Sequence, residues 1–215
     1  MNLVVLGEKV GPLEVITYVA ACPETREALV VDPGGPAPAL KERLTREGWR
    51  VRWIVNTHGH ADHTAGNDLW ARETGATIVM HRLDWEFFSR PEMQAEARKE
   101  GFPPLTRVDL LVEDGHLLPL GLWQFQIIHT PGHTPGAICL YVPGHLFTGD
   151  TLFVEAAGRT DLPGGSLEQL LHSLQEKILP LPDDTRIWPG HDYGGAATSL
   201  LGEEKLNNPY LTDFF

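Results

Sequence analysis

The sequence predicts an α/β fold of two β-sheets with helices on their outer faces, forming a single domain over residues 1–215. The chain has 215 residues, of which 42% are hydrophobic and 21% are charged, a composition typical of a globular protein with its own core. Short β-branched runs occur in two groups, with segments of helical periodicity between and after them. No Ser/Gly-rich or charge-block segment marks a linker between domains.

The first group of predicted strands consists of four apolar runs, at 13–20, 28–31, 51–55 and 77–80. Helices are predicted between and after these strands, at 37–47, 67–73 and 83–101. Leu40 and Leu44 share one face of the first of these helices, and Gly48 is a suitable C-cap for it. Pro91 breaks the third helix.

The second group of predicted strands consists of five runs, at 108–112, 123–128, 138–142, 146–148 and 186–188. The strongest helix signal lies at 166–179, where Ser166 is the expected N-cap. Five apolar residues form an i, i+3/i+4 stripe along this helix: Leu167, Leu170, Leu171, Leu174 and Ile178. A short helix is expected at 200–206.

Charge and cysteine content exclude several classes of function. Lys and Arg number 17 and Asp and Glu 29, which gives a net charge of −12, so electrostatic capture of nucleic acid or an anionic membrane is disfavoured. Cys22 and Cys139 are too few for a disulfide framework, and neither belongs to a CxxC pair. No run approaches 18 apolar residues, and the N-terminal segment lacks the features of a signal peptide. We therefore expect a cytoplasmic protein without nucleic-acid or membrane partners.

The sequence contains ten histidines, and three of them lie in the THGHADH segment at 57–63, directly after a predicted strand. In an extended loop, side chains two residues apart point the same way, so His58 and His60 can hold one ion. Asp62 and His63 lie where a helix begins and can face a second ion. Imidazole and carboxylate suit zinc, iron or manganese without any thiolate. A polar surface loop with chance histidines is the alternative, but their density favours a metal site.

Three further polar residues each follow a glycine just past the end of a predicted strand: His133, Asp150 and His191. Ligand pockets of α/β proteins lie at strand ends. Each residue alone would be read as structural, but together they predict loops that converge with the histidine segment at one edge.

The order of these motifs, THGHADH, Pro-Gly-His, Thr-Gly-Asp and Pro-Gly-His, resembles the metallo-β-lactamase superfamily from about Val4 to the C-terminus. The resemblance implies an αββα sandwich of two mixed sheets, with helices on the outer faces and a metal site at one edge. It further implies one metal ion bound by His58, His60 and His133. A second ion would be bound by Asp62, His63 and His191, with Asp150 bridging both.

Within the superfamily, the sequence is similar to the glyoxalase II-like branch, the hydroxyacylglutathione hydrolases, and to the persulfide dioxygenases. Gly158-Arg159-Thr160-Asp161 and the tail that begins His191-Asp192-Tyr193 carry this similarity. It implies a hydrolase with two divalent ions, expected to be zinc, whose bound hydroxide attacks a small thioester such as an acyl-glutathione. Asp62 has a second expected role, orienting that hydroxide. Only 24 residues follow His191 (215 − 191), too few for the glutathione-binding extension of glyoxalase II, which leaves the thiol carrier open.

Two alternatives remain at this point. One Fe(II) held by the facial triad His58, His133 and Asp150 would oxidise a glutathione-type persulfide to sulfite with O₂. The HDYxG tail favours this dioxygenase, whereas the Pro-Gly before His191 weakens it. A metal-stabilised binding module is the other alternative, but structural zinc sites are usually closed and often contain cysteine.

Three residues outside the proposed ligands have expected roles, each with a structural alternative. Asp32 can accept the free N–H of a ligand histidine or form a turn before Pro33. Arg159 can bind a substrate carboxylate or pair with Asp161. Tyr193 can donate to substrate or simply pack. The apolar tail at 209–211 and 214–215 is a candidate surface for a homodimer.

Overall fold

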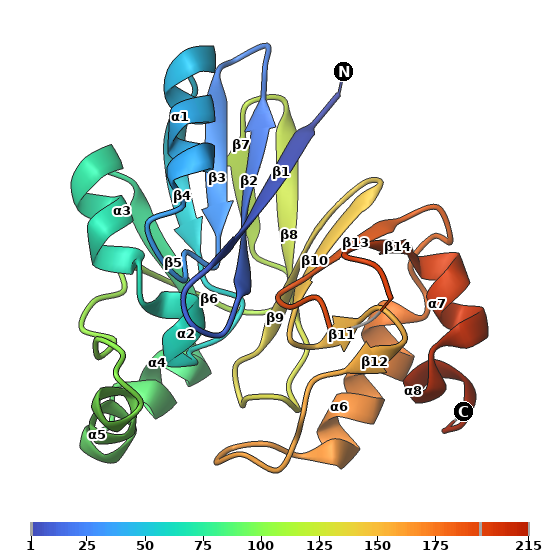
Figure 1. The fold of residues 1–215 in the computed structure, drawn as a ribbon. Helices are drawn as coiled ribbons and strands as arrows, with labels where there is room; N and C mark the ends of the chain where they lie inside the picture. The colour runs from blue at the N-terminus through green and yellow to red at the C-terminus, as the bar shows by residue number, and fades with distance from the viewer. Residues whose placement is uncertain (1, 194, 215) are drawn as a thin grey trace.

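Two six-stranded sheets lie face to face, and helices cover their outer surfaces (Figure 1). The computed structural model describes residues 2–193 and 195–214. Residue 215, which belongs to the tail considered for dimerisation, lies outside the described residues, as do 1 and 194. The predicted α/β fold with two mixed sheets is confirmed.

The first sheet follows chain order and consists of β1 (Val4–Val10), β2 (Val15–Cys22), β3 (Glu27–Val31), β4 (Arg50–Val55), β5 (Thr77–His81) and β6 (Leu110–Val112). Strands β1 to β3 pair antiparallel, while β3 to β6 run parallel. Parallel neighbours need long crossovers, and helices supply them: α1 (Pro38–Glu47), α2 (Ala61–Thr64), α3 (Asn67–Thr74), α4 (Arg82–Phe88) and α5 (Pro91–Lys99). The C-terminal ends of β3 and β4 therefore lie side by side.

The second sheet consists, in spatial order, of β14 (Ser199–Leu200), β13 (Arg186–Pro189), β10 (His145–Gly149), β9 (Ile138–Val142), β8 (Trp123–His129) and β7 (Leu117–Leu120). Only β10 and β13 are parallel within it. A small ribbon of β11 (Leu152–Phe153) and β12 (Ala156–Ala157) follows β10. The later helices are α6 (Leu167–Ser173), the π-helical turn η1 (Leu174–Ile178), α7 (Leu201–Asn207) and α8 (Pro209–Thr212).

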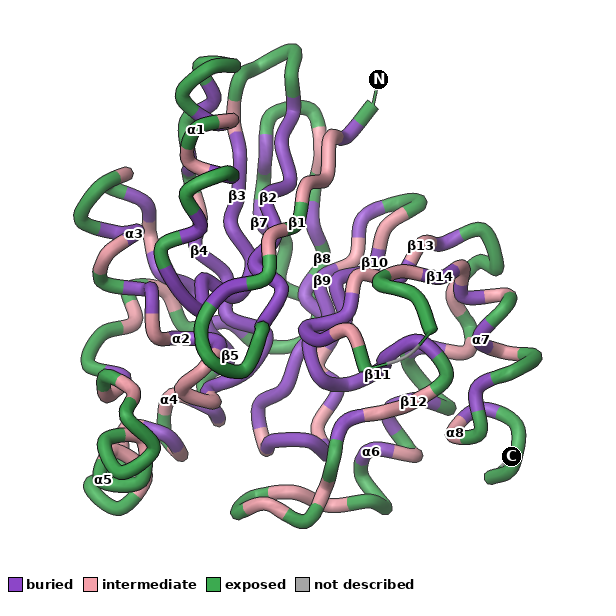
Figure 2. The backbone as a smooth tube through the Cα atoms, in the orientation of Figure 1, coloured by how far each residue is buried: buried purple, intermediate pink, exposed green. Residues whose placement is uncertain are grey.

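Apolar clusters hold the layers together. One lies between the two sheets and includes the fully buried Phe125 and Phe147. Another packs α1 and α3 onto the first sheet around Trp70, and a third packs the C-terminal helices onto the second sheet around Leu170. Figure 2 shows buried backbone along the strands, whereas α5 is largely exposed. None of the helices within 2–193 and 195–214 combines the length and apolar character needed to cross a membrane.

The structure departs from the sequence-based prediction at sheet edges and in one helix. The run at 108–112, expected with the second group of strands, forms β6 and pairs with β5 in the first sheet. Strands β1 and β7 were not expected, because polar residues or Pro119 interrupt their apolar pattern, and pairing with β2 and β8 completes them. The helix predicted at 166–179 begins as expected, with Ser166 Oγ accepting the amide of Gln169. It becomes π-helical after Ser173, and Leu167 at the start of the stripe is exposed.

Candidate metal centre

Four loops from both sheets meet at one edge of the sandwich. One follows β4 and carries the histidine segment at 57–63. The other three follow β8, β10 and β13 and carry His133, Asp150 and His191. Because β10 and β13 are parallel neighbours, Asp150 and His191 leave the second sheet side by side.

Backbone hydrogen bonds join the two sheets at this edge. The amide of Ile138, at the start of β9, donates to the carbonyl of Thr57 at 2.8 Å. The amide of Ile16 in β2 donates to the carbonyl of Gly190 at 2.8 Å. The loops that carry the histidines are therefore positioned by the main chain as well as by side-chain packing.

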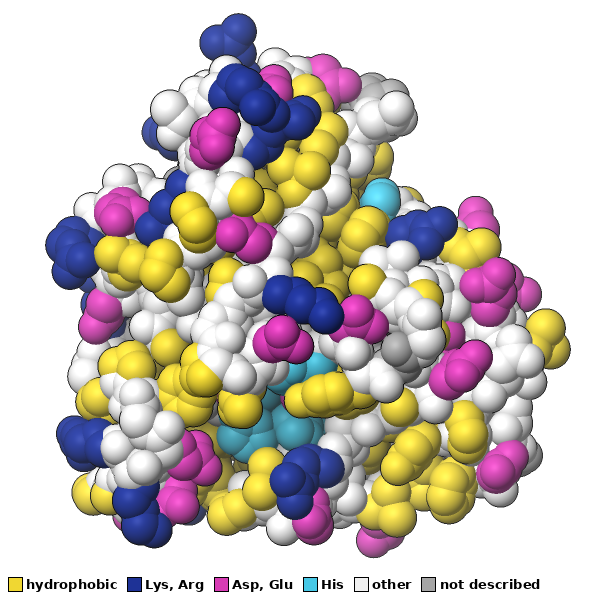
Figure 3. Space-filling model, in the orientation of Figure 1, with side chains coloured by type: hydrophobic (Ala, Val, Ile, Leu, Met, Phe, Trp, Pro, Cys, Tyr) yellow, Lys and Arg dark blue, Asp and Glu magenta, His cyan; other side chains and the backbone are white. Residues whose placement is uncertain are grey.

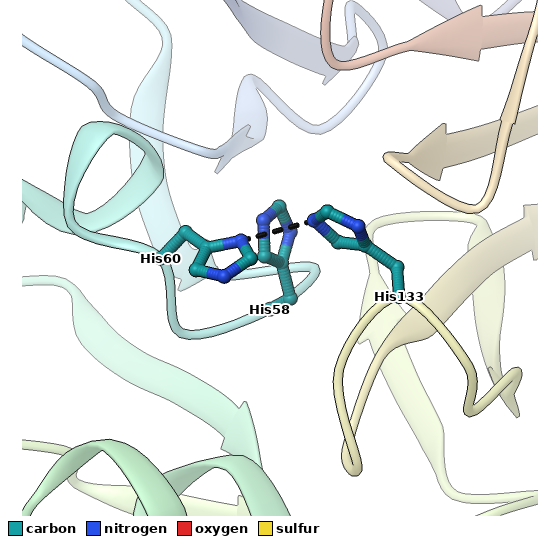
Figure 4. Close-up of side chains that lie close together, drawn as sticks. All are labelled: His58, His60 and His133. Atoms are coloured by element: carbon teal, nitrogen blue, oxygen red, sulfur yellow. Dashed lines mark hydrogen bonds between the residues drawn. The ribbon is translucent and has the colours of Figure 1, made fainter. Parts of the chain in front are cut away.

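His58, His60 and His133 form the first group of converging side chains (Figure 4). Their ring nitrogens lie within 4.8 Å of one another, and His60 Nδ1 is 3.0 Å from His133 Nε2. His58 and His60 come from the same loop, and His133 reaches them from the loop after β8. His133 Nδ1 donates to the carbonyl of Arg159 at 2.8 Å, so the Nε2 lone pair of this imidazole faces the other two rings.

Asp62, His63 and His191 form the second group, again with one ligand atom each within 4.8 Å. His63 Nε2 lies 3.2 Å from His191 Nε2. Asp62 Oδ2 is 3.4 Å from His191 Nε2 and 3.6 Å from His63 Nε2. One ligand atom from each of these three residues thus lies in one small space.

Asp150 lies between the two groups. Its Oδ2 is 3.6 Å from His133 Nε2 and 3.7 Å from His191 Nε2, and its Oδ1 is 3.4 Å from His63 Nε2. This carboxylate therefore lies within 4 Å of a ligand atom of each group. The structure thus brings together all seven residues that the sequence proposed as ligands.

Burial and charge set the protonation of the two groups differently. Burial lowers the pKa of His58 well below its ordinary value and that of His60 to about 3, so these rings are neutral and able to donate a lone pair. Burial also opposes the charge of His63, but Asp62, Asp150 and Asp32 outweigh it and raise the pKa of His63 to about 10. The carboxylates around His63 therefore favour a positive charge in the second group, on the imidazole or on a bound cation.

The donor set fits a divalent cation. Within the described residues, His58 Nε2 and Asp150 Oδ1 are buried and have no hydrogen-bond partner. Such atoms are costly unless a ligand satisfies them. Imidazole nitrogens and carboxylate oxygens suit zinc, iron and manganese. These residues could therefore hold metal ions, and the donor set alone does not select one.

Asp32 supports the histidine segment from the end of β3. It is 1% exposed and accepts from the amide of Thr57 at 2.7 Å, the hydroxyl of Thr57 at 2.6 Å and His63 Nδ1 at 2.9 Å. The last contact directs His63 Nε2 into the second group. The Thr57 hydroxyl also lies 3.1 Å from His58 Nδ1 and, since its proton goes to Asp32, accepts from that ring.

Asp84 in α4 holds the same segment from the other side, a role that the sequence did not predict. It is fully buried and accepts from the amide of Gly59 at 2.8 Å, the hydroxyl of Thr134 at 2.8 Å and the amide of Gly136. It thus joins the loop of His58 and His60 to the loop of His133. An aspartate in the first turn of a helix is ordinary, so no sequence signal distinguished it.

Arg159 and Tyr193 lie at the rim of the site. The exposed guanidinium of Arg159 makes two hydrogen bonds to Asp161, at 2.7 and 2.8 Å, which is the structural alternative considered for it. Its backbone carbonyl, as described above, accepts from His133. The Tyr193 ring is 68% exposed and stacks on His191 with centroids 4.8 Å apart.

Two mixed sheets with a buried histidine and aspartate cluster at one edge define a metal-binding α/β protein. The sequence matches the Metallo-beta-lactamase superfamily over residues 11–191. The chain belongs to this superfamily, as the motif order predicted.

Curated relatives come from both branches that the sequence resembles. The chain is 36% identical over 200 residues to the human mitochondrial persulfide dioxygenase ETHE1, covering 91% of this chain and 71% of the relative. It is 35% identical over 198 residues to hydroxyacylglutathione hydrolase GloC of Haemophilus influenzae, covering 87% of this chain and 89% of the relative. The predicted branch is confirmed, but nearly equal identities do not separate the two activities.

A solved structure supports the fold. The crystal structure of TTHA1623 in a di-iron-bound form superimposes with a TM-score of 0.80 and 31% sequence identity, covering 96% of this chain and all of that one. The αββα sandwich implied by the motifs is therefore the fold of this chain.

Proposed function

We propose that this protein is a metal-dependent hydrolase of small thioesters, such as an acyl-glutathione. The hydrolase would use two divalent ions, which we expect to be zinc. The observation that carries this proposal is the position of Asp150 between two complete groups of ligand atoms. A site for a single ion needs only one such group. The similarity to GloC supports the same reaction class.

The proposed reaction assigns a role to each of these residues. One ion would be held by His58, His60 and His133. The other ion would be held by Asp62, His63 and His191. The carboxylate of Asp150 would contact both ions. Ions held there supply a Lewis acid and lower the pKa of water. The Asp62 carboxylate, 14% exposed, would accept a hydrogen bond from the attacking water and orient it. Water adds its oxygen to the carbonyl carbon, the C–S bond breaks, and the sulfur leaves as a thiol.

Residues at the rim would contact the substrate. Tyr193 is exposed beside His191, and its hydroxyl would donate to the bound thioester. Arg159 would reach a substrate carboxylate once it releases Asp161. Asp32 would position His63.

A cytoplasmic location belongs to the same proposal and is supported by Cys22 and Cys139, which are both free and buried.

The test measures metal content and thioesterase activity of the wild type and His58→Ala. We expect about two zinc ions per chain in protein purified without added metal. His58→Ala should lose metal and at least about 100-fold in kcat/KM. His172→Ala removes an exposed histidine of α6 and should match the wild type. Undiminished hydrolysis by a metal-free His58→Ala protein would refute the proposal.

The second candidate is a persulfide dioxygenase with one Fe(II), held by His58, His133 and Asp150. The similarity to human ETHE1 favours it specifically. Anaerobic iron loading followed by an oxygen-uptake assay with glutathione persulfide separates the two functions. One iron per chain and stoichiometric oxygen uptake would support the dioxygenase, whereas two zinc ions and no uptake would support the hydrolase.

A further inference from the structure

A cavity of about 170 Å³ opens beside His60, and its walls are mainly apolar. Figure 3 shows the imidazoles in a hollow bordered by hydrophobic side chains. The cavity walls come from α4, α5 and the segments that follow α5 and β12. The apolar residues that line it include Phe88, Met93, Ala97, Leu105, Leu162 and Pro163.

The cavity is continuous with the candidate metal centre. Gly59 and His60 form part of its wall, and the Phe88 ring stands edge-on to His60 with centroids 5.2 Å apart. A Cβ on Gly59 would lie 2.2 Å from Phe88 Cδ2, so α4 packs directly on the histidine loop. A group in this cavity would therefore adjoin whatever reacts at the site.

Helix α5 covers the cavity and packs on the core through Met93, which contacts the buried cluster of Met80, Phe88 and Leu105. None of its residues is buried, yet Met93 and Ala97 turn partly buried faces to the cavity. Gln94 Nε2 donates to the carbonyl of Leu105 and, at 3.4 Å, to that of Phe88. These bonds and the packing of Met93 hold α5 over the cavity, so the helix forms one wall of a binding surface.

The rim of the cavity is acidic. Glu96 of α5 and Glu100, which directly follows the helix, both line it. Glu96 pairs with Lys99 at 3.0 Å, while no ion pair of Glu100 is found among the residues that the structure describes. Carboxylates at the entrance disfavour an anionic group in an apolar cavity.

We propose that this cavity binds the acyl group of the thioester and selects an uncharged, apolar one. This inference rests on the proposed thioesterase function. The volume sets the size of the group, because an apolar protein cavity of roughly 150 Å³ accepts benzene. A phenyl ring or a branched alkyl group of similar size fills the cavity, whereas an acetyl group leaves it open.

The test compares three thioesters of one thiol, N-acetylcysteamine, that carry acetyl, phenylacetyl or 4-carboxyphenylacetyl groups. We expect kcat/KM for phenylacetyl to exceed that for each of the others about tenfold or more. Ala97→Phe fills the cavity and should abolish the preference for phenylacetyl over acetyl. Ala95→Phe places the same ring on the exposed side of α5 and should keep the preference.

Binding of neutral phenylacetamide, measured by calorimetry, tests the cavity without catalysis. We expect Ala97→Phe to weaken it about tenfold relative to the wild type and to Ala95→Phe. Equal kcat/KM for acetyl and phenylacetyl in the wild type, or equal phenylacetamide binding by the two variants, overturns the acyl-cavity proposal and leaves the thioesterase standing. Absence of hydrolysis for all three thioesters, with intact phenylacetamide binding, overturns the proposed function instead.

Discussion

Asp32 and Asp84 are two buried carboxylates that hold the same histidine loop from opposite sides, and they are stabilised in different ways. Asp32 contacts Thr57 and the imidazole of His63, a ring whose pKa is raised by the surrounding carboxylates. Among the residues that the structure describes, the hydrogen-bond donors to Asp84 are one hydroxyl and two backbone amides. The first is compensated by a group able to carry positive charge, and the second by neutral donors alone.

The difference shows in the ionisation of Asp84. Burial raises its pKa from 3.8 to about 6, although three hydrogen bonds oppose the shift. The two carboxylates also act over different ranges. Asp32 directs one imidazole of the second group, whereas Asp84 ties together the loops that carry all three histidines of the first group. Changing each carboxylate should therefore have separable effects.

The largest effect is expected from Asp32→Ala. The change leaves the buried Thr57 amide and His63 Nδ1 without an acceptor, which should cost about 3–5 kcal/mol of unfolding free energy. Metal affinity should fall about 10–100-fold, because the tautomer of His63 is no longer fixed. Urea unfolding of chelator-treated protein and metal titration measure the two effects. Asp183→Ala, at a largely exposed ion pair with Lys205, should cost about 1 kcal/mol or less. Equal losses of unfolding free energy in Asp32→Ala and Asp183→Ala would contradict the stabilising role assigned to Asp32.

An intermediate effect is expected in the pH dependence of stability. The pKa of Asp84 is higher in the folded chain than in the unfolded one, so its protonated form stabilises the fold below about pH 4. That contribution, about 3 kcal/mol at most, is lost as the pH rises through about 6. Unfolding free energies of the wild type minus those of Asp84→Asn should therefore fall between pH 4 and 6. A flat difference over that range would show that Asp84 ionises as it does in the unfolded chain.

The smallest effects are expected from a matched pair, Thr57→Val and Thr134→Val. Each removes one hydroxyl from a buried carboxylate and should cost about 1–2 kcal/mol of stability. Only the Thr57 hydroxyl also reaches an imidazole, His58 Nδ1. Thr57→Val should therefore lower kcat/KM about tenfold, while Thr134→Val should lower it less than about threefold. The reverse order of activity would indicate that Asp84 governs the site more than Asp32.

Local spacing was enough to predict much of the fold and the cluster. Two sequence signals predicted that seven His and Asp side chains lie at one edge. One is the spacing of two residues between side chains in the loop after a strand, and the other is a polar residue that follows a glycine at the end of another strand. The structure brings these seven side chains together. The parallel pairs β3–β4 and β10–β13 make this possible, because their ends are neighbours.

What the sequence analysis missed depends on contacts between distant segments. Strand β1 is completed by pairing with β2 and not by its own apolar pattern. Asp84 acts on a loop 25 residues before it and on Thr134, 50 residues after it. Arg159 contributes a backbone carbonyl to His133, a role that residue identity does not reveal. These features follow from the packing of whole elements and not from the type of any one residue.

The cluster draws its side chains from both sheets: His58 and His60 follow a strand of the first, and Asp150 and His191 follow strands of the second. A cation shared by these loops would be a crosslink between the two halves of the sandwich, comparable in effect to a disulfide. Resistance to heat and to proteolysis should then rise with the free metal concentration. The amount of folded protein in a cell would in that way follow the cell's metal supply.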